Sequence, residues 1–222
     1  MAWAGVKTFI DNFDRAQAFT TTPGMNGWTA VLTGTTPTAV CFTEDGGGAG
    51  LATTNTSEAQ LAVLYQNDVL MYDVRKIHQA WWVLKMGTVD SVTNVAVGLA
   101  SAHNTTLDSV ATNAWFRLIG ATSTTNIVVE TDDATNDTDD KAAGTLSTVY
   151  KKFLVDFTQG LADVRFFIDG ARVASGTTFN MSSLGAGLNV QPYLSFGKAS
   201  GTGILQCYCA QFGITYDWSY GA

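Results

Sequence analysis

The sequence has few charged residues and few residues that favour helices. Of its 222 residues only 14% are charged, against about 25% in an average globular domain, and glutamate occurs only three times. Threonine, a β-branched residue, occurs 31 times, and glycine occurs 22 times. Because β-branched residues favour strands and the common helix formers are scarce, the composition predicts an all-β protein with at most one or two short helical turns.

Basic residues and long apolar runs are also missing. Twelve Lys and Arg residues against nineteen Asp and Glu residues give a net charge of -7, which argues against nonspecific binding to nucleic acid, because such binding needs a basic surface. No apolar run approaches the length of about 18 residues that a membrane-spanning helix needs. The N-terminal residues lack the basic and apolar regions of a signal peptide. These absences predict a protein that folds in the cytoplasm and binds neither nucleic acid nor a membrane.

Cysteine and histidine are too few to indicate a disulfide framework or a zinc site. The three cysteines, Cys41, Cys207 and Cys209, are an odd number, and a Cys-x-Cys pair is not a usual zinc spacing. The two histidines, His78 and His103, are far apart in sequence. We expect three free thiols, as in a protein that folds in a reducing compartment.

What the sequence does contain is a series of short apolar runs separated by Gly, Thr, Asn and Asp, which is the pattern of an antiparallel β-sandwich. The length and the absence of a Pro-rich linker predict a single domain over residues 1–222. The predicted strands are Trp28–Leu32, Ala39–Thr43, Gln60–Tyr65, Ile77–Met86, Val92–Ala100, Ala114–Ile119, Asn126–Thr131, Thr148–Phe157, Asp163–Ile168, Ala171–Ala174, Pro192–Phe196 and Ile204–Trp218.

The segments between the strands also give specific expectations. Asp169-Gly170 separates two apolar runs and predicts a two-residue hairpin turn, because both positions need a positive φ. In the last strand, the alternation predicts that Tyr208 and Phe212 share a face opposite to Cys207, with a bulge or bend at Gly213. The short helical turns are expected at Met181–Leu184 and Thr106–Ala111, and the flexible or acidic loops at Thr43–Gly50 and Glu130–Lys141.

The order of these pieces resembles a known fold. The strand Tyr150–Phe157, the Asp-Gly hairpin in Val164–Arg172, the loop Met181–Leu188 and the closing strand Leu205–Trp218 resemble the concanavalin A-like and laminin G-like jelly roll. The N-terminal segment 9–15, followed by Gly27-Trp28, looks like openings of tailed-phage virion proteins that carry such jelly rolls. The resemblance implies a jelly roll over the whole chain, but one fold carries many functions.

No arrangement of residues indicates an enzyme. Glucanases with this fold carry two glutamates and an aspartate that alternate on one strand, whereas Glu44, Glu58 and Glu130 are isolated. His78 and His103 lie in no nucleophile motif, and no phosphate-binding loop is present. We therefore predict no catalytic residues and no cofactor.

Metal and sugar ligands remain alternatives. The segment Glu130–Lys141 holds six of the nineteen acids, and its carboxylates, above all Asp133, Asp137 and Asp139, could hold Ca²⁺, although their spacing departs from an EF-hand loop. The adjacent Trp81 and Trp82 must face opposite sides of a strand. One of them could be exposed to stack on a sugar, or both could be packed.

The sequence favours interaction over catalysis. Our leading hypothesis is a structural protein of a tailed-phage virion, which stabilises the capsid as a decoration protein through contacts with the major capsid protein or other virion subunits. We expect a homotrimer, with docking through the apolar N-terminal residues Trp3, Val6 and Phe9, although the same segment could instead form an edge strand of its own sheet. The alternative is a lectin-like module of a phage tail fibre or appendage that binds carbohydrate.

Overall fold

A computed structural model of the chain describes residues 3–14, 19–41, 47–67, 72–87, 89–183 and 189–220. These residues form two antiparallel β-sheets that lie face to face. The regular helices in this part of the chain are four single 3₁₀ turns, at Met25–Gly27 (η1), Val74–Lys76 (η2), Leu107–Ser109 (η3) and Leu161–Asp163 (η4). None of these helices is long and apolar enough to cross a membrane. The prediction of an all-β sandwich is confirmed.

Sixteen strands make up the two sheets. They are β1 (Trp3–Asp11), β2 (Thr29–Thr33), β3 (Thr38–Cys41), β4 (Ala49–Ala52), β5 (Gln60–Tyr65), β6 (Tyr72–Asp73), β7 (Ile77–Met86), β8 (Thr93–Ala100), β9 (Asn113–Ile119), β10 (Asn126–Asp132), β11 (Asp137–Thr145), β12 (Lys151–Asp156), β13 (Arg165–Ile168), β14 (Ala171–Val173), β15 (Asn189–Lys198) and β16 (Gln206–Tyr220).

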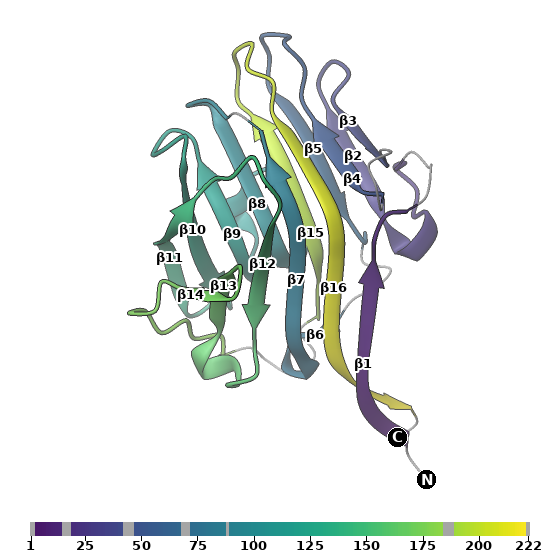
Figure 1. The fold of residues 1–222 in the computed structure, drawn as a ribbon, viewed down its shortest axis with the longest axis vertical. Coiled ribbons are helices and arrows are strands. Elements are labelled where there is room, and N and C mark those ends of the chain that lie inside the picture. The colour runs from purple at the N-terminus through teal and green to yellow at the C-terminus, as the bar shows by residue number, and fades with distance from the viewer. Residues whose placement is uncertain are drawn as a thin grey trace.

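The strand order separates the sheets clearly. The front sheet, nearer the viewer in Figure 1, has the order β14-β13-β12-β7-β16-β4-β3, with β1 also paired to β16. The back sheet has the order β11-β10-β9-β8-β15-β5-β2, with β6 also paired to β15. Neighbours in sequence such as β7 and β8 lie in different sheets, so the chain passes repeatedly between the two layers.

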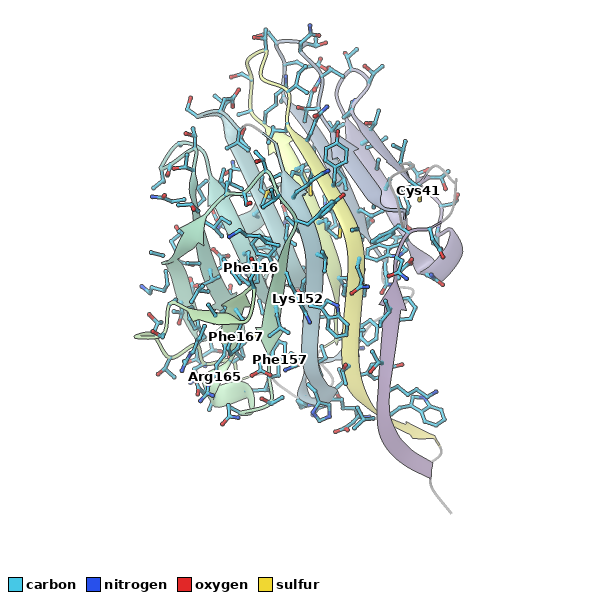
Figure 2. All side chains as sticks on the ribbon, viewed as in Figure 1. Cys41, Phe116, Lys152, Phe157, Arg165 and Phe167 are labelled. Atoms are coloured by element: carbon cyan, nitrogen blue, oxygen red, sulfur yellow. The ribbon has the colours of Figure 1, made fainter. Side chains whose placement is uncertain are left out.

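The core lies between the sheets and is rich in aromatic rings. Phe116 of the back sheet meets Phe153 and Phe166 of the front sheet edge to face, with ring centroids 5.1 and 5.3 Å apart. Figure 2 shows Phe116 among the side chains between the two layers. Trp82 is fully buried in this core. Its neighbour Trp81 lies on the opposite face, yet it is only 9% exposed because other side chains cover it.

All twelve predicted strands are present, with ends shifted by up to a few residues. The structure adds β4, β6 and β11, which the sequence did not indicate as strands, and it forms β1 from the N-terminal segment, for which an edge strand was the alternative to a docking segment. The prediction of a loop over Glu130–Lys141 was wrong, because its two ends belong to β10 and β11 and only residues 133–136 turn between them. The loop expected at Thr43–Gly50 lies partly outside the described residues, and Gly50 belongs to β4.

The turns were predicted with mixed success. Asp169 and Gly170 have φ values of 49° and 80°, so the hairpin turn is confirmed. The helical turn expected at Thr106–Ala111 is present as η3. Of Met181–Leu184, the described residues 181–183 form a bend without a helix, and Leu184 lies outside the described part.

The last strand changes face, which overturns the predicted alternation. Cys207, Cys209, Phe212 and Ile214 all point into the core, because the register shifts between Cys209 and Gln211. Such a bulge inserts one extra residue and exchanges the two faces of the strand beyond it. The bulge therefore lies at residue 210 and not at Gly213. No disulfide joins the three cysteines, as expected.

The first and last strands form a ribbon that extends beyond the two layers, at the bottom of Figure 1. Asp11, at the end of β1, is buried and accepts hydrogen bonds from Phe13 N and from the side chains of Asn26 and Trp28, at 2.8–2.9 Å. These bonds fix the ribbon to the body of the sandwich. Among the expected docking residues, Val6 is 62% exposed, while Phe9 packs against the core and the side chain of Trp3 lies outside the described part.

Candidate functional site

The outer face of the back sheet, which points away from the core, carries a second apolar cluster. Its members on the strands are Val63, Tyr65, Ala96, Ala100, Trp115 and Tyr193. They stand at every second position of β5, β8, β9 and β15, so the alternation of these strands puts them all on one face. An open sheet face would leave these side chains in water, yet Trp115 and Tyr193 are fully buried. Something must therefore cover this face.

The cover is the connection between β8 and β9, residues 101–112, which we call the covering segment. Leu107 and Val110 of this segment join the outer apolar cluster. His103 Nδ1 lies 2.9 Å from the hydroxyl oxygen of Tyr193, and the His103 ring is 5.5 Å from that of Tyr65. Partial burial lowers the pKa of His103. The segment is thus held over the middle of the sheet by apolar packing and by a neutral imidazole.

Two hollows flank the covering segment. The larger, the acidic hollow, has a volume of about 490 Å³ and lies over β9, β10 and β11. The smaller, the neutral hollow, measures about 280 Å³ and lies over β5 and β15. Asn94, Thr105 and Leu107 line both hollows. The acidic hollow falls in the size range of ligand pockets, which is about 300–1,000 Å³. Its acidic lining consists of Asp108, Glu130, Asp132, Asp137, Asp139 and Asp140.

A buried ion pair forms the floor of the acidic hollow. Arg117 Nη1 donates to Glu130 Oε2 at 2.8 Å and to Asp108 Oδ1 at 2.5 Å. The side chains of Arg117 and Glu130 are only 7% and 4% exposed, whereas Asp108 is 74% exposed. Arg117 and Glu130 lie on neighbouring strands and point to the same face, two positions out of register. Asp108, on the covering segment, accepts a second hydrogen bond from the guanidinium of Arg117.

A β-bulge between β10 and β11 places two further carboxylates opposite Glu130. The register between β10 and β11 shifts between Val129 and Thr131, and Asp140 has a φ of 50°, in the left-handed region. The extra residue brings both Asp139 and Asp140 opposite Glu130. Bulges of this kind re-aim side chains and often lie next to functional sites.

Burial and mutual repulsion alter the acidity of this site. Burial raises the pKa of Glu130 to about 7, although the Arg117 guanidinium opposes the shift. Burial, a hydrogen bond with Asp139 and repulsion from that carboxylate raise the pKa of Asp137 to about 6. Perturbed acids gathered in a hollow are a general mark of functional sites. Such carboxylates can accept hydrogen bonds from ligand hydroxyl or ammonium groups.

Two buried polar atoms in the wall lack partners. Nε of Arg117 and Oδ1 of Asn113 have no hydrogen-bond partner among the described residues. Both residues line the acidic hollow. Buried polar groups are nearly always paired with protein, water or ligand atoms. Arg117 and Asn113 therefore each keep one buried polar atom unpaired beneath the surface of the hollow.

The three predicted metal ligands do not come together. Asp133 lies in the β10–β11 turn, where Oδ1 accepts from Thr135 N at 3.0 Å and Oδ2 from Ser183 N at 2.8 Å. Burial would raise the pKa of Asp133, but these and further donors hold it below its usual value. Asp137 and Asp139 instead line the acidic hollow. No group of three or more His, Cys, Asp or Glu side chains in the described part of the chain is arranged to hold a metal ion.

Sequence reasoning missed Arg117, Asp108 and Asn113. Asn113, Trp115 and Arg117 alternate on β9, and this pattern would have placed them on one face. The sequence does not show which of the two faces of a central strand is the core face when both are buried. His78, expected to be structural, lies within hydrogen-bond distance of Asp217 on the front sheet, with Nε2 2.9 Å from Oδ1.

Comparison with known proteins bears on the fold. No model of a known protein family matches the chain, and no curated protein matches its sequence. Solved structures do match it. The GH16 protein of the Bacteroides ovatus mixed linkage glucan PUL, in complex with its G4G4G3G product, has a TM-score of 0.64 at 10% identity, over 93% of this chain and 99% of that one.

Two further similar structures come from different kinds of protein. A beta-1,3-glucanase from Mycobacterium marinum has a TM-score of 0.60 at 14% identity, over 95% of this chain and 97% of that one. The potassium-bound carbohydrate recognition domain of Emp46p has a TM-score of 0.58 at 10% identity, over 93% and 94%. The chain therefore has the concanavalin A-like jelly-roll fold that glucanases and lectin-like domains share, which confirms the fold part of the predicted resemblance.

Proposed function

We propose that this protein is a carbohydrate-recognition domain that holds a short glycan in the acidic hollow without cleaving it. The observation that carries the proposal is that six carboxylates converge on one hollow. Carboxylates accept hydrogen bonds from sugar hydroxyls. The fold adds support, because similar structures include glycanases and a carbohydrate recognition domain.

The shape and charge of the site define the ligand. The covering segment occupies the middle of the sheet face, so a long glycan cannot run across it and the hollow admits a short or terminal unit. Against six acids the hollow has one buried arginine, Arg117. Acidic sugars would be repelled, because like charges at close range cost several kcal/mol in low dielectric. We propose a neutral or amino-sugar ligand.

The position of Glu130 argues against cleavage. Glycoside hydrolysis needs one carboxylic acid that reaches the glycosidic oxygen and a second carboxylate across the sugar. The pKa of Glu130, about 7, would suit an acid. However, its side chain is 4% exposed and its Oε2 is bonded to Arg117, so it is turned into the floor of the hollow. We therefore retain the proposal of a non-enzymatic protein.

Glycan binding is the direct test. The protein is applied to an array that contains neutral, amino and acidic sugars, and hits are measured by calorimetry. We expect neutral or amino sugars to bind, and Asp137→Asn/Asp139→Asn to weaken binding by about tenfold, which is the effect of losing one or two hydrogen bonds. The matched control, Asp163→Asn on the front-sheet side, should bind as the unaltered protein does. Binding to no sugar would overturn the proposal, and release of reducing ends would identify a hydrolase.

A role in a tailed-phage particle is a second proposal, favoured by the ribbon of β1 and β16. Val6 and Ile10 on this ribbon are 62% and 49% exposed, and exposed apolar side chains on a projecting element can dock on another virion subunit. A capsid-stabilising homotrimer would show a trimer mass in light scattering and would be detected in purified particles by mass spectrometry. A monomer that is absent from such particles would end this proposal.

A further inference from the structure

One buried ammonium group has only neutral oxygens at hydrogen-bond distance, while the Glu58 carboxylate interacts with it electrostatically from further away. Lys198, at the end of β15, is 3% exposed. Its Nζ lies 2.5 Å from Thr54 O, 2.9 Å from Thr56 O, 2.8 Å from Gly201 O and 3.1 Å from Gly203 O. No carboxylate in the described part of the chain lies within ion-pair distance of this ammonium. Buried lysines normally pair with an acid, so this one is unusual.

The number of oxygens exceeds what hydrogen bonding alone requires. An ammonium group has three N–H donors, whereas four carbonyl oxygens surround Nζ. The arrangement is therefore that of a cation coordinated by dipoles. Rings of backbone carbonyls replace the hydration shell of K⁺ in the same way in selective channels. Ca²⁺ and Mg²⁺ favour carboxylate ligands and shorter distances, so a site made of carbonyls alone suits a monovalent ion.

The carbonyls belong to two loops that connect the sheets. Thr54 and Thr56 lie between β4 of the front sheet and β5 of the back sheet. Gly201 and Gly203 lie between β15 of the back sheet and β16 of the front sheet. Both loops project at the upper end of the molecule in Figure 1. The single charge of Lys198 thus binds two of the connections between the sheets at this end of the sandwich.

Other bonds hold the oxygens in place without the lysine. Thr53 N donates to Leu205 O at 3.0 Å and Leu205 N donates to Thr53 Oγ1 at 2.9 Å, which joins the two loops directly. The Gln60 side chain accepts from Thr54 N at 2.7 Å and donates to Thr54 Oγ1 at 2.6 Å. The part of the cage of carbonyls on the β4–β5 loop is therefore held, and joined to the β15–β16 loop, without the lysine. Lys198 also lines the neutral hollow, which gives solvent ions a way in when its side chain is shortened.

We propose that the four carbonyl oxygens of Thr54, Thr56, Gly201 and Gly203 form a monovalent-cation site that the protein fills with its own Lys198 ammonium. Removal of the side chain converts it into a site for K⁺ or NH₄⁺ from solution. In the unaltered protein the Lys198 ammonium occupies the site, so the β4–β5 and β15–β16 loops are held together whatever ions the medium contains.

The test is rescue of Lys198→Ala by ions. We expect this variant to melt about 5–10 °C below the unaltered protein in LiCl, as a loss of a few kcal/mol implies for this size. KCl or NH₄Cl should recover part of the loss in a saturable manner, because an ion that binds only the folded state stabilises it. Tetramethylammonium chloride at the same ionic strength should not restore the stability of the variant, since this cation is too large for the cage of carbonyls. A crystal of the variant grown with Rb⁺ should show its anomalous signal among the four oxygens.

Three comparisons keep the test decisive. Lys198→Met fills the space without a charge and should be destabilised but not rescued by any salt. Lys152→Ala, which removes an exposed lysine of the front sheet, and the unaltered protein should show no ion-specific shift. Equal rescue by tetramethylammonium, Lys198→Met as stable as the unaltered protein, or Lys198→Ala that fails to fold in both KCl and LiCl would each overturn the proposal.

Discussion

At the scale of single residues, the buried Arg117 has two carboxylate partners, Glu130 and Asp108. Breaking a buried ion pair is costly, because the remaining charge has no partner. Here Asp108, on the covering segment, shares the same Nη1 as Glu130. The guanidinium therefore keeps a partner when Glu130 binds a proton. Glu130 can change its charge near neutral pH without leaving Arg117 unpaired.

This arrangement predicts a pH-dependent stability. The pKa of Glu130 rises from 4.5 to about 7 on folding, so between these values the native state holds a proton that the unfolded chain has released. The stability that this proton contributes is complete below about pH 4.5 and is lost as the pH rises through about 7. Asp137, whose pKa rises to about 6, acts in the same direction. We expect urea unfolding midpoints to fall from pH 5 to pH 7.5.

Glu130→Gln should flatten this profile, because the amide keeps an oxygen for Arg117 but does not titrate. The control is Glu58→Gln, since hydrogen bonds from Gln60 and Thr35 lower the pKa of Glu58 and keep it charged throughout the window. This control should keep the slope of the unaltered protein. An unchanged slope in Glu130→Gln would contradict the assignment.

At the scale of elements, β7 and β16 depend on a contact that only glycine allows. A Cβ at Gly213 would lie 2.1 Å from Cζ2 of Trp81, so the indole lies flat against the backbone of the neighbouring strand. Trp81 Nε1 donates to Gln211 Oε1 at 2.9 Å, and Lys152 Nζ lies 4.8 Å from the ring centroid. Figure 2 labels this lysine on the front sheet.

Gly213→Ala should therefore lift Trp81 off the sheet. We expect a loss of about 1–3 kcal/mol, as for other overpacked sites, together with greater exposure of a tryptophan, measured by urea unfolding and by iodide quenching of fluorescence. Gly5→Ala is the matched control in the same sheet, because a Cβ there meets nothing within 4 Å. Its stability should change by less than about 0.5 kcal/mol. Equal losses in both variants would refute the role of the close approach.

The elements also show why sequence reasoning succeeded for some strands and failed for others. The strands that are nearly continuous apolar runs, such as β7 and β8, could be predicted because strands buried on both faces favour that pattern. β11 could not, since it begins with Asp137, Thr138, Asp139 and Asp140 and lies at the edge of the back sheet, where no apolar face is required. The bulge at residue 210 has no sequence signature, because it depends on the register with β7.

At the scale of the whole molecule, the outer face of the back sheet carries a second buried apolar cluster, separate from the core between the sheets. The sequence predicted two layers of β-sheet but not a third layer over one of them. The apolar residues Leu107 and Val110 were interpreted as part of a short helical turn, and nothing local shows that they cover Trp115 and Tyr193. The candidate site could not be predicted for the same reason, because its wall includes the covering segment.

Removing the cover should open the face. Ser101 N donates to Thr112 O at 2.9 Å, so the base of the covering segment is already closed like a hairpin. Replacement of residues 103–110 by Asn-Gly should expose Trp115 and Tyr193, shift tryptophan emission to longer wavelength and increase binding of a hydrophobic dye. Glycans longer than those bound by the unaltered protein should then bind. If emission and dye binding stay unchanged, the segment does not cover the face.

The position of β16 in the front sheet constrains how the chain folds during synthesis. β16 is the last strand in sequence, yet it lies between β7 on one side and β4 and β1 on the other. Until it leaves the ribosome, the front sheet consists of three separate parts, and the edges of β7, β4 and β1 have no partner. Contacts between segments far apart in the chain form slowly, because a long loop must close first. Because unpaired strand edges can pair with other chains, the nascent protein is exposed to aggregation until the fifteen-residue β16 joins the three parts.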